Sequence, residues 1–215
     1  MARGRFITLE GGEDVGKSTQ IRLLKDALEG AGVTVVTTRE PGGSPGGEEI
    51  RTLLVNGDTH KWEPLTEALL NYAARHEHLE KVILPALNAG TWVLCDRFAD
   101  STMAYQGYGH GMNREVIRRL HRLIVGDIAP DLTLILDMPV ESGLARAGVR
   151  EAHDGQGEDR YERMGHDFHN RLRQGFLDIA KKDTVRYEVI DASGDIGAVA
   201  MAIHETVATR MKVAF

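Results

Sequence analysis

Short apolar runs alternate along the chain with longer segments in which apolar residues recur every three or four positions. The run FITL at 6–9 is apolar apart from one threonine, and VTVVTT at 33–38 contains only β-branched residues, so both predict buried strands. Similar runs predict strands at 92–95, 132–136 and 185–190.

The intervening segments have the spacing of amphipathic helices. After Lys17, apolar residues at Ile21, Leu24 and Leu28 fall on one helical face, before the glycines at 30 and 32. Strands that alternate with helices form a parallel sheet covered on both faces, so we expect one three-layer α/β domain over 1–215 with five parallel strands. The other predicted helices span 48–55, 66–87, 114–125, 168–180 and 198–211.

One polar segment interrupts this alternation. Residues 148–158 (GVREAHDGQGE) contain three glycines and are flanked by arginines. A disordered surface loop and a mobile lid over an active site both fit this composition.

The charge balance narrows the possible partners. The 26 basic residues are outnumbered by 32 acidic ones, giving a formal net charge of −6. This excess argues against broad nucleic-acid binding and against a polybasic membrane contact. No stretch reaches the ~18–20 apolar residues of a membrane span, and the N-terminus lacks the apolar core of a signal peptide. We therefore expect a cytoplasmic protein, and its single cysteine, Cys95, allows no intrachain disulfide.

The residues after the first strand match the pattern G-x-x-x-x-G-K-[S/T]. Glycines let such a loop wrap a polyphosphate with its backbone amides, and the following helix directs the positive end of its dipole to the same place. Lys17 would contact the β- and γ-phosphates, and the Ser18 hydroxyl would bind Mg²⁺. The residues predicted to hold the nucleotide are Gly11, Gly12, Glu13, Asp14, Val15, Gly16, Lys17, Ser18 and Thr19.

Polar residues at two further strand ends distinguish between classes of phosphate-loop protein. Arg39 follows the second strand, and Asp96 and Arg97 follow the third, at the edge where ligands bind in open α/β sheets. A carboxylate there can hold Mg²⁺ and an arginine can bind an acceptor phosphate, as a small-molecule kinase requires. A guanine-nucleotide switch usually carries Asn-Lys-x-Asp, and the chain has no Asn-Lys pair. A nucleotide-driven motor usually needs a longer chain.

Several segments together resemble the bacterial thymidylate kinase family of P-loop nucleoside monophosphate kinases. TREPGG at 38–43 and DRFADSTMAYQG at 96–107 carry most of the specificity beside the phosphate loop. The resemblance implies a P-loop NTPase type fold, a homodimer, and phosphorylation of dTMP to dTDP with ATP and Mg²⁺ for DNA synthesis. Shorter matching segments are YAAR at 72–75, LPAL at 84–87, PDLTLILD at 130–137 and DRYE at 159–162.

The resemblance also implies roles for residues of the acceptor site. Arg39 and Arg97 would bind the acceptor phosphate, and Arg75 would read the edge of thymine. Glu13 would lie near the sugar hydroxyl. The base and sugar would be enclosed by the segment that contains Ser101, Thr102, Tyr105 and Gln106.

A further cation is expected from a lid at about 146–162, because the phosphate loop contains no arginine. Arg150 and Arg160 are the predicted catalytic arginines of this lid, and Arg146 is a further candidate. They would act with Lys17 and Arg97 on the transferring phosphoryl group, while Ser18 and Asp96 would hold the metal.

One position departs from the family pattern. The family commonly places an aromatic residue four positions before Arg75, where it stacks on thymine, whereas this chain has Asn71 with Tyr72 beside it. Neighbours on a helix point about 100° apart, so Tyr72 does not simply replace that ring. Two alternatives stay open: a deoxynucleoside monophosphate kinase of shifted or broader specificity, and a regulatory protein that binds nucleotide without turnover.

The histidines that lie close together in the sequence do not suggest a metal site. His76 and His78 are two positions apart on a predicted helix and would point to different sides. His166 and His169 can meet on one helical face, but beside Asp167 they indicate a solvated surface.

Overall fold

The structure, a computed structural model, describes residues 3–145 and 160–215. At its centre lies a five-stranded sheet with the order β2-β3-β1-β4-β5, in which every neighbouring pair is parallel. This confirms the predicted α/β fold with a parallel sheet. The strands are β1 (Phe6–Gly11), β2 (Val35–Arg39), β3 (Trp92–Asp96), β4 (Leu132–Asp137) and β5 (Tyr187–Asp191).

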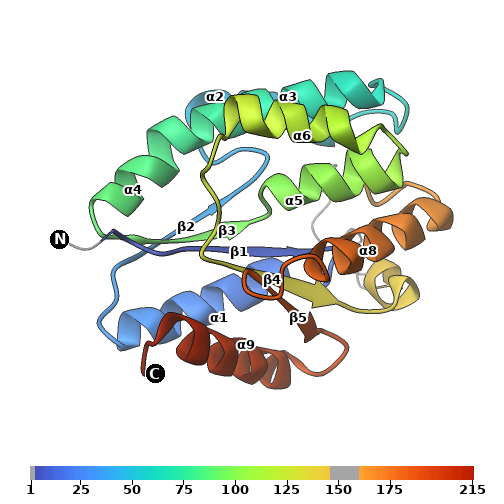
Figure 1. The fold of residues 1–215 in the computed structure, drawn as a ribbon. Helices are drawn as coiled ribbons and strands as arrows, with labels where there is room; N and C mark the ends of the chain where they lie inside the picture. The colour runs from blue at the N-terminus through green and yellow to red at the C-terminus, as the bar shows by residue number, and fades with distance from the viewer. Residues whose placement is uncertain (1–2, 146–159) are drawn as a thin grey trace.

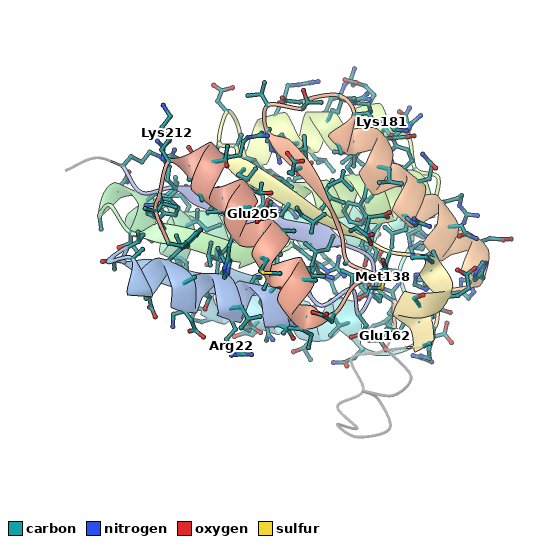
Figure 2. The ribbon with its side chains drawn as sticks, turned by 90° about the horizontal axis from the view of Figure 1, so that it is seen from below. Arg22, Met138, Glu162, Lys181, Glu205 and Lys212 are labelled. Atoms are coloured by element: carbon teal, nitrogen blue, oxygen red, sulfur yellow. The ribbon has the colours of Figure 1, made fainter. Side chains whose placement is uncertain are left out.

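Two helices cover one face of the sheet. Helices α1 (Lys17–Gly30) and α9 (Ile196–Met211) pack side by side beneath the strands (Figures 1 and 2). Leu24 and Leu28 of α1 and Ile203 of α9 are fully buried against the alternate strand residues that point to this face. The apolar stripe read along 17–30 is therefore the surface that α1 packs on the sheet.

The opposite face is covered by further helices, most of which lie above the sheet in Figure 1. Phe6 of β1 meets Phe98 edge to face at 5.0 Å in the core beneath them. On this face α8 packs beside β4 and β5 and against residues 103–109. These helices are α2 (Pro45–Val55), α3 (Pro64–His78), α4 (Leu84–Asn88), α5 (Ala99–Thr102), α6 (Arg114–Ile124) and α8 (His166–Ala180).

Two local features differ from the helices expected from periodicity. The segment predicted as one helix over 66–87 is α3, a π-helical turn at Leu79–Ile83 and then α4, whose first turn contains Pro85. Proline is tolerated there because the first turn needs no backbone donor. A second π-helical segment, Met103–Gly109, follows α5. No helix was predicted over α5 or over this second segment. Their polar and glycine residues mask the helical period.

The described helices also bear on the membrane prediction. Over residues 3–145 and 160–215, no helix is both long and apolar enough to cross a membrane.

Candidate functional site

The nine residues predicted to hold a nucleotide form the turn between β1 and α1 and the first turn of α1. Gly11 and Gly16 have φ values of 139° and 94°, a region that favours glycine. A Cβ on Gly11 would lie 2.5 Å from the carbonyl oxygen of Leu136, so the close approach of β4 also requires glycine. Within the described residues, no side chain caps the start of α1. Its first amides can therefore meet an anion, as the sequence pattern predicts.

Lys17 is held against this loop. Its Nζ donates a 2.6 Å hydrogen bond to the carbonyl oxygen of Gly12, and the side chain is almost fully buried. Burial and the nearby Arg97 charge lower the pKa of Lys17 to about 8, although Asp96 and Glu13 oppose them. A bound polyphosphate would favour the charged ammonium and reverse this shift.

Ser18 and Asp96 bring two oxygen ligands together beside the loop. The Ser18 hydroxyl donates a 2.8 Å hydrogen bond to Asp96 Oδ2, and Asp96 Oδ1 is buried without a hydrogen-bond partner among the described residues. Mg²⁺ is commonly held by one or two protein oxygens together with substrate phosphates and water. The unpartnered carboxylate oxygen and the adjacent hydroxyl fit that requirement.

Arg97 connects the phosphate loop with the region next to it. The residue has φ 68° and begins the connection from β3 to α5, where its amide donates a 2.9 Å bond to the Leu9 carbonyl oxygen. Its guanidinium donates to the carbonyl oxygen of Gly11 at 2.7 Å and to Glu13 Oε2 at 3.0 Å. These contacts direct the arginine across the loop and towards the neighbouring pocket.

Glu13 is a second charged group at this junction. Burial alone would raise its pKa, but the charges of Arg97 and Lys17 and a hydrogen bond from Tyr105 lower it to about 2. The Arg97 guanidinium also lies 5.1 Å from the centre of the Tyr105 ring. Glu13 is therefore ionised at neutral pH, which suits it to pair with cations and to accept from hydroxyl groups.

A pocket lined by polar and aromatic side chains opens beside Arg97. It contains four of the residues predicted to enclose the acceptor's base and sugar, which are Ser101, Thr102, Tyr105 and Gln106. Glu13 lines the same pocket. Arg39 lies elsewhere, exposed at the end of β2, where its guanidinium donates a 3.0 Å bond to Glu48 Oε2.

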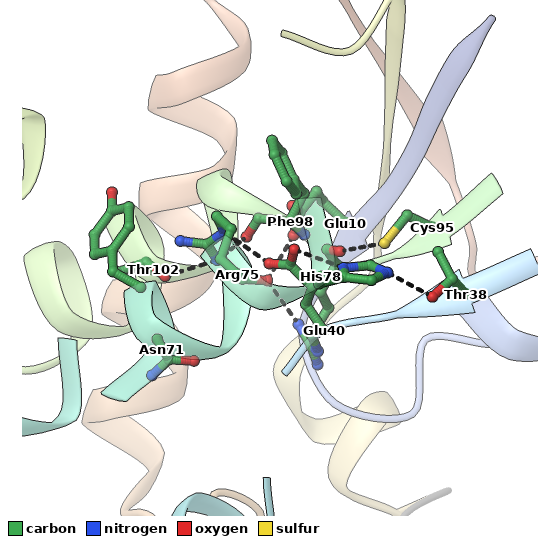
Figure 3. A network of polar contacts seen from close by, with 12 residues as sticks. Glu10, Thr38, Glu40, Asn71, Arg75, His78, Cys95, Phe98 and Thr102 are labelled. Atoms are coloured by element: carbon green, nitrogen blue, oxygen red, sulfur yellow. Dashed lines mark hydrogen bonds and ion pairs between the residues drawn. The ribbon is translucent and has the colours of Figure 1, made fainter. Parts of the chain in front are cut away.

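Arg75 lies behind the pocket wall, fully buried on α3 (Figure 3). Its Nε donates to Glu40 Oε2 at 2.7 Å, and its Nη2 donates to the Phe98 carbonyl oxygen at 3.0 Å and to Thr102 Oγ1 at 3.1 Å. Nη1 has no hydrogen-bond partner among the described residues. Burial opposes the charge of Arg75, but Glu40 outweighs it and raises the pKa of the guanidinium.

A second buried ion pair lies behind the pocket-lining residue Gln106. Arg160 is fully buried, and its Nη2 lies 2.5 Å from Glu67 Oε2. The same arginine donates to the carbonyl oxygens of Leu54, Asp58 and Thr59. Glu67 Oε1 in turn accepts a 2.6 Å bond from Gln106 Nε2. These contacts give Arg160 a structural role beside the pocket, and its predicted catalytic role stays a prediction.

The other predicted lid arginines, Arg146 and Arg150, lie outside the described residues. Their predicted roles, and that of the lid at about 146–162, stay predictions.

Sequence reasoning missed several residues of the pocket. Arg51 and Tyr161 line it, and Glu40 both lines it and holds Arg75. The Tyr161 ring lies 5.2 Å from that of Tyr105 in an edge-to-face arrangement. Asn71, which stands where the family commonly has an aromatic residue, lines the same pocket. Tyr161 is therefore a candidate for the ring that would stack on the base in its place. In the DRYE segment only Arg160 was assigned a role, and the neighbouring tyrosine was the available signal.

Comparisons with known proteins agree on one family. Residues 9–203 match the family model described as thymidylate kinase. The chain is 53% identical to the thymidylate kinase of Caulobacter vibrioides over 98% of this chain and 99% of that protein. It is 49% identical to that of Ruegeria pomeroyi over 97% and 96% of the two chains. The crystal structure of thymidylate kinase from Ehrlichia chaffeensis is similar, with a TM-score of 0.76, 35% identity and coverage of 95% and 99%.

A further carboxyl, Glu10 of β1, lies beneath the site and is fully buried. It accepts a 2.7 Å hydrogen bond from the Phe98 amide, and the Ser101 hydroxyl lies 2.6 Å from its other oxygen. Burial, reinforced by the charge of Asp100, raises the pKa of Glu10 to about 8. Glu10 therefore holds the start of α5 as a neutral acid around pH 7.

Replacing this acid tests that protonation state. Between about pH 5 and pH 8 the folded protein would carry a proton on Glu10 that the unfolded chain has lost, so this group makes stability fall as pH rises, by about 1.4 kcal/mol per pH unit. Glu10→Gln keeps one acceptor and one donor but does not titrate. The free energy of unfolding of this variant should therefore fall less steeply with rising pH than that of the native protein. Denaturant unfolding at three pH values measures both slopes.

Glu205→Gln, on the exposed surface of α9 (Figure 2), is the matched control and should leave the slope unchanged. Equal slopes for the native protein and Glu10→Gln would show that Glu10 is ionised in the folded state.

Proposed function

The chain belongs to the thymidylate kinase family, and on that premise we propose that it transfers the γ-phosphoryl group of ATP to the phosphate of dTMP, giving ADP and dTDP. It is an enzyme of nucleotide biosynthesis. The geometry of Arg97 carries the proposal, because this one side chain contacts the phosphate loop and lines the adjoining pocket. A donor phosphate in the loop and an acceptor phosphate at the pocket would meet there.

The reaction demands charge and position more than covalent chemistry. An acceptor phosphate already carries a nucleophilic oxygen, so no general base is needed, and catalysis rests on orienting and neutralising two anions. Lys17 would contact the transferring phosphoryl group from the side of the loop, and Arg97 would hold the acceptor phosphate. Mg²⁺ on Ser18 and Asp96 would add charge at the donor phosphates when bound.

The present partners of Arg97 are groups that a bound phosphate can replace. Its present contacts are two loop carbonyl oxygens and the Glu13 carboxylate. An acceptor phosphate offers a two-pronged partner of higher charge than a carbonyl oxygen. Glu13 would then be available for the acceptor's sugar hydroxyl, with Tyr105 fixed beside it.

The base of the acceptor would lie deeper in the pocket. We assign its recognition to Arg75, whose Nη1 is the donor left over by its protein partners, together with Thr102 and Gln106. A thymine carbonyl accepts such a donor, whereas the amino group of cytosine does not. Arg39, which is exposed and lines a separate hollow with Ser18 and Asp96, would assist with the acceptor phosphate.

We also propose a homodimer through the helical layer formed by α2, α3 and α6, in which α3 contacts both of the other helices above the sheet in Figure 1. This layer exposes large apolar residues that a single chain leaves in water. They are Leu53, Leu65, Leu69 and Leu123, of which Leu123 is 81% exposed. Large apolar side chains exposed together on one layer are typical of an interface between chains.

Lys17→Ala tests the phosphate-loop assignment. Removing one preorganised charge from a transferring group typically costs about 10²–10³ in rate, so kcat for dTMP should fall by at least that factor while the fold is kept. Lys81→Ala, an exposed lysine away from the loop, should retain normal turnover. Steady-state ADP release with and without dTMP gives both values, and near-normal turnover of Lys17→Ala would contradict the assignment.

An acceptor panel tests the substrate. With ATP-Mg²⁺, dTMP should exceed dUMP only modestly, because one methyl group in an apolar pocket contributes about 1–3 kcal/mol. dCMP should be the poorer acceptor, and Arg75→Ala should narrow the advantage of dTMP over dCMP in kcat/KM by about tenfold or more. Arg22→Ala, on the exposed face of α1, serves as control. Equal use of dCMP and dTMP by the native enzyme would exclude thymine reading by Arg75.

Sedimentation equilibrium tests the dimer. The native protein should sediment at twice the mass of one chain, and Leu69→Glu with Leu123→Glu should give the single-chain mass, because two buried carboxylates oppose association. Met201→Glu is the control, since Met201 is 63% exposed on α9 in the opposite layer. A monomeric native protein, or dissociation by the control alone, would contradict this interface.

A further inference from the structure

A chain of four side chains connects the end of β2 with the buried arginine on α3 (Figure 3). Thr38 Oγ1 lies 2.6 Å from His78 Nε2, and His78 Nδ1 lies 3.0 Å from Glu40 Oε1. The other oxygen of Glu40 accepts the 2.7 Å bond from Arg75 Nε. His78 and Glu40 are both buried, so water does not compete for these contacts.

The donors and acceptors along this chain fix where the imidazole proton lies. An ionised carboxylate only accepts, so His78 Nδ1 carries the hydrogen that faces Glu40. The Thr38 hydroxyl can then donate to Nε2. The single positive charge of Arg75 is already matched by the single negative charge of Glu40, which leaves a neutral ring as the balanced arrangement.

The loop that follows β2 also packs against this imidazole. Gly43 has φ 81°, and a Cβ there would lie 2.5 Å from His78 Nε2. The Gly43 amide donates a 2.9 Å hydrogen bond to Glu48 Oε1, on the side chain that also binds Arg39. His78 therefore lies at the point where the TREPGG turn, Glu40 and the last turn of α3 come together.

Glu40 in turn decides how Arg75 is oriented. A guanidinium is planar, so the bond from Nε to Glu40 and the bonds from Nη2 to Phe98 and Thr102 fix its plane. Only Nη1 then remains without a partner among the described residues. A rotation of the Glu40 carboxylate would turn this plane and move that donor.

We propose that His78 is a positioning residue for acceptor selection: with its proton on Nδ1 and its Nε2 accepting from Thr38, it holds Glu40 in the orientation that lets Arg75 present Nη1 to the acceptor base. The inference rests on the proposed reading of the base by Arg75. His78 itself touches neither substrate nor reacting atoms. It acts through two intervening contacts, and its replacement should alter acceptor binding more than turnover.

Substitutions at His78 separate this role from general stability. His78→Leu removes both hydrogen bonds and should raise KM for dTMP about tenfold and narrow the preference for dTMP over dCMP, with kcat and KM for ATP changed less than about threefold. His78→Gln can donate to Glu40 and accept from Thr38, so it should recover most of the native KM. His76→Leu, an exposed histidine two residues earlier on α3, should match the native enzyme.

A second pair of variants tests the chain of contacts without altering α3. Thr38→Val keeps the side-chain shape but removes the donor to Nε2, and should move KM for dTMP and the dCMP preference in the same direction as His78→Leu. Thr37→Val, the exposed neighbour on β2, should leave both unchanged. If folded His78→Leu or Thr38→Val keeps the native KM and the native base preference, the proposal is overturned.

The protonation of His78 is measured in the free enzyme, independently of activity. ¹⁵N-edited NMR of the imidazole should show hydrogen on Nδ1 and none on Nε2, and Thr38→Val should perturb the Nε2 signal. Hydrogen on Nε2 would overturn the contact chain even if Arg75→Ala alters base preference. The expected tautomer with an unchanged base preference in Arg75→Ala would instead refute the base reading, and this inference with it.

Discussion

Parallel pairing of all five strands is the constraint from which the site follows. The register places Leu9 of β1 and Arg39 of β2 opposite Asp96 at the end of β3, and Gly11 opposite Leu136 of β4. Because every strand runs the same way, the residues that follow them emerge at one edge of the sheet. The phosphate loop, the metal-binding oxygens and the acceptor-binding arginine therefore meet there without any long excursion of the chain. Helix α1 starts at the same edge and directs its free amides to the loop.

Three arginine–glutamate pairs surround the proposed acceptor pocket. Arg97 with Glu13 lies on the phosphate side, Arg75 with Glu40 lies behind the proposed base site, and Arg160 with Glu67 lies behind Gln106. Each pair removes charges from water, which is tolerated because further hydrogen bonds satisfy most of the remaining donors, Arg75 Nη1 excepted. The buried Arg75 and Arg160 pairs are costly to rearrange, so this part of the pocket is shaped before a substrate arrives. Preorganised charge of this kind also reconciles an arginine-rich site with a net charge of −6.

The departure at Asn71 is understandable in this setting. Its amide donates to the Glu67 carbonyl oxygen one helical turn earlier, and the side chain lines the pocket that also contains Tyr161. A ring from a segment some ninety residues away in sequence can thus lie near the position that the family usually fills from α3 itself. The position of an aromatic side chain in space matters to a base, whereas its position in the sequence does not.

The sequence by itself determined the sheet, most of the helices, the phosphate loop and the family, because these depend on local periodicity and on residues that are neighbours along the chain. It also singled out Arg75 and Arg97, whose motifs are contiguous. Only the tertiary structure decided which carboxylates hold these arginines, since Glu40 lies 35 positions from Arg75 and Glu13 lies 84 positions from Arg97. It also showed that His78, to which the sequence assigned no role, connects Thr38 of β2 with Glu40, the partner of Arg75. Burial and ion pairing depend on which surfaces pack together in the folded chain. The spacing of residues along the sequence does not show which distant residues these will be.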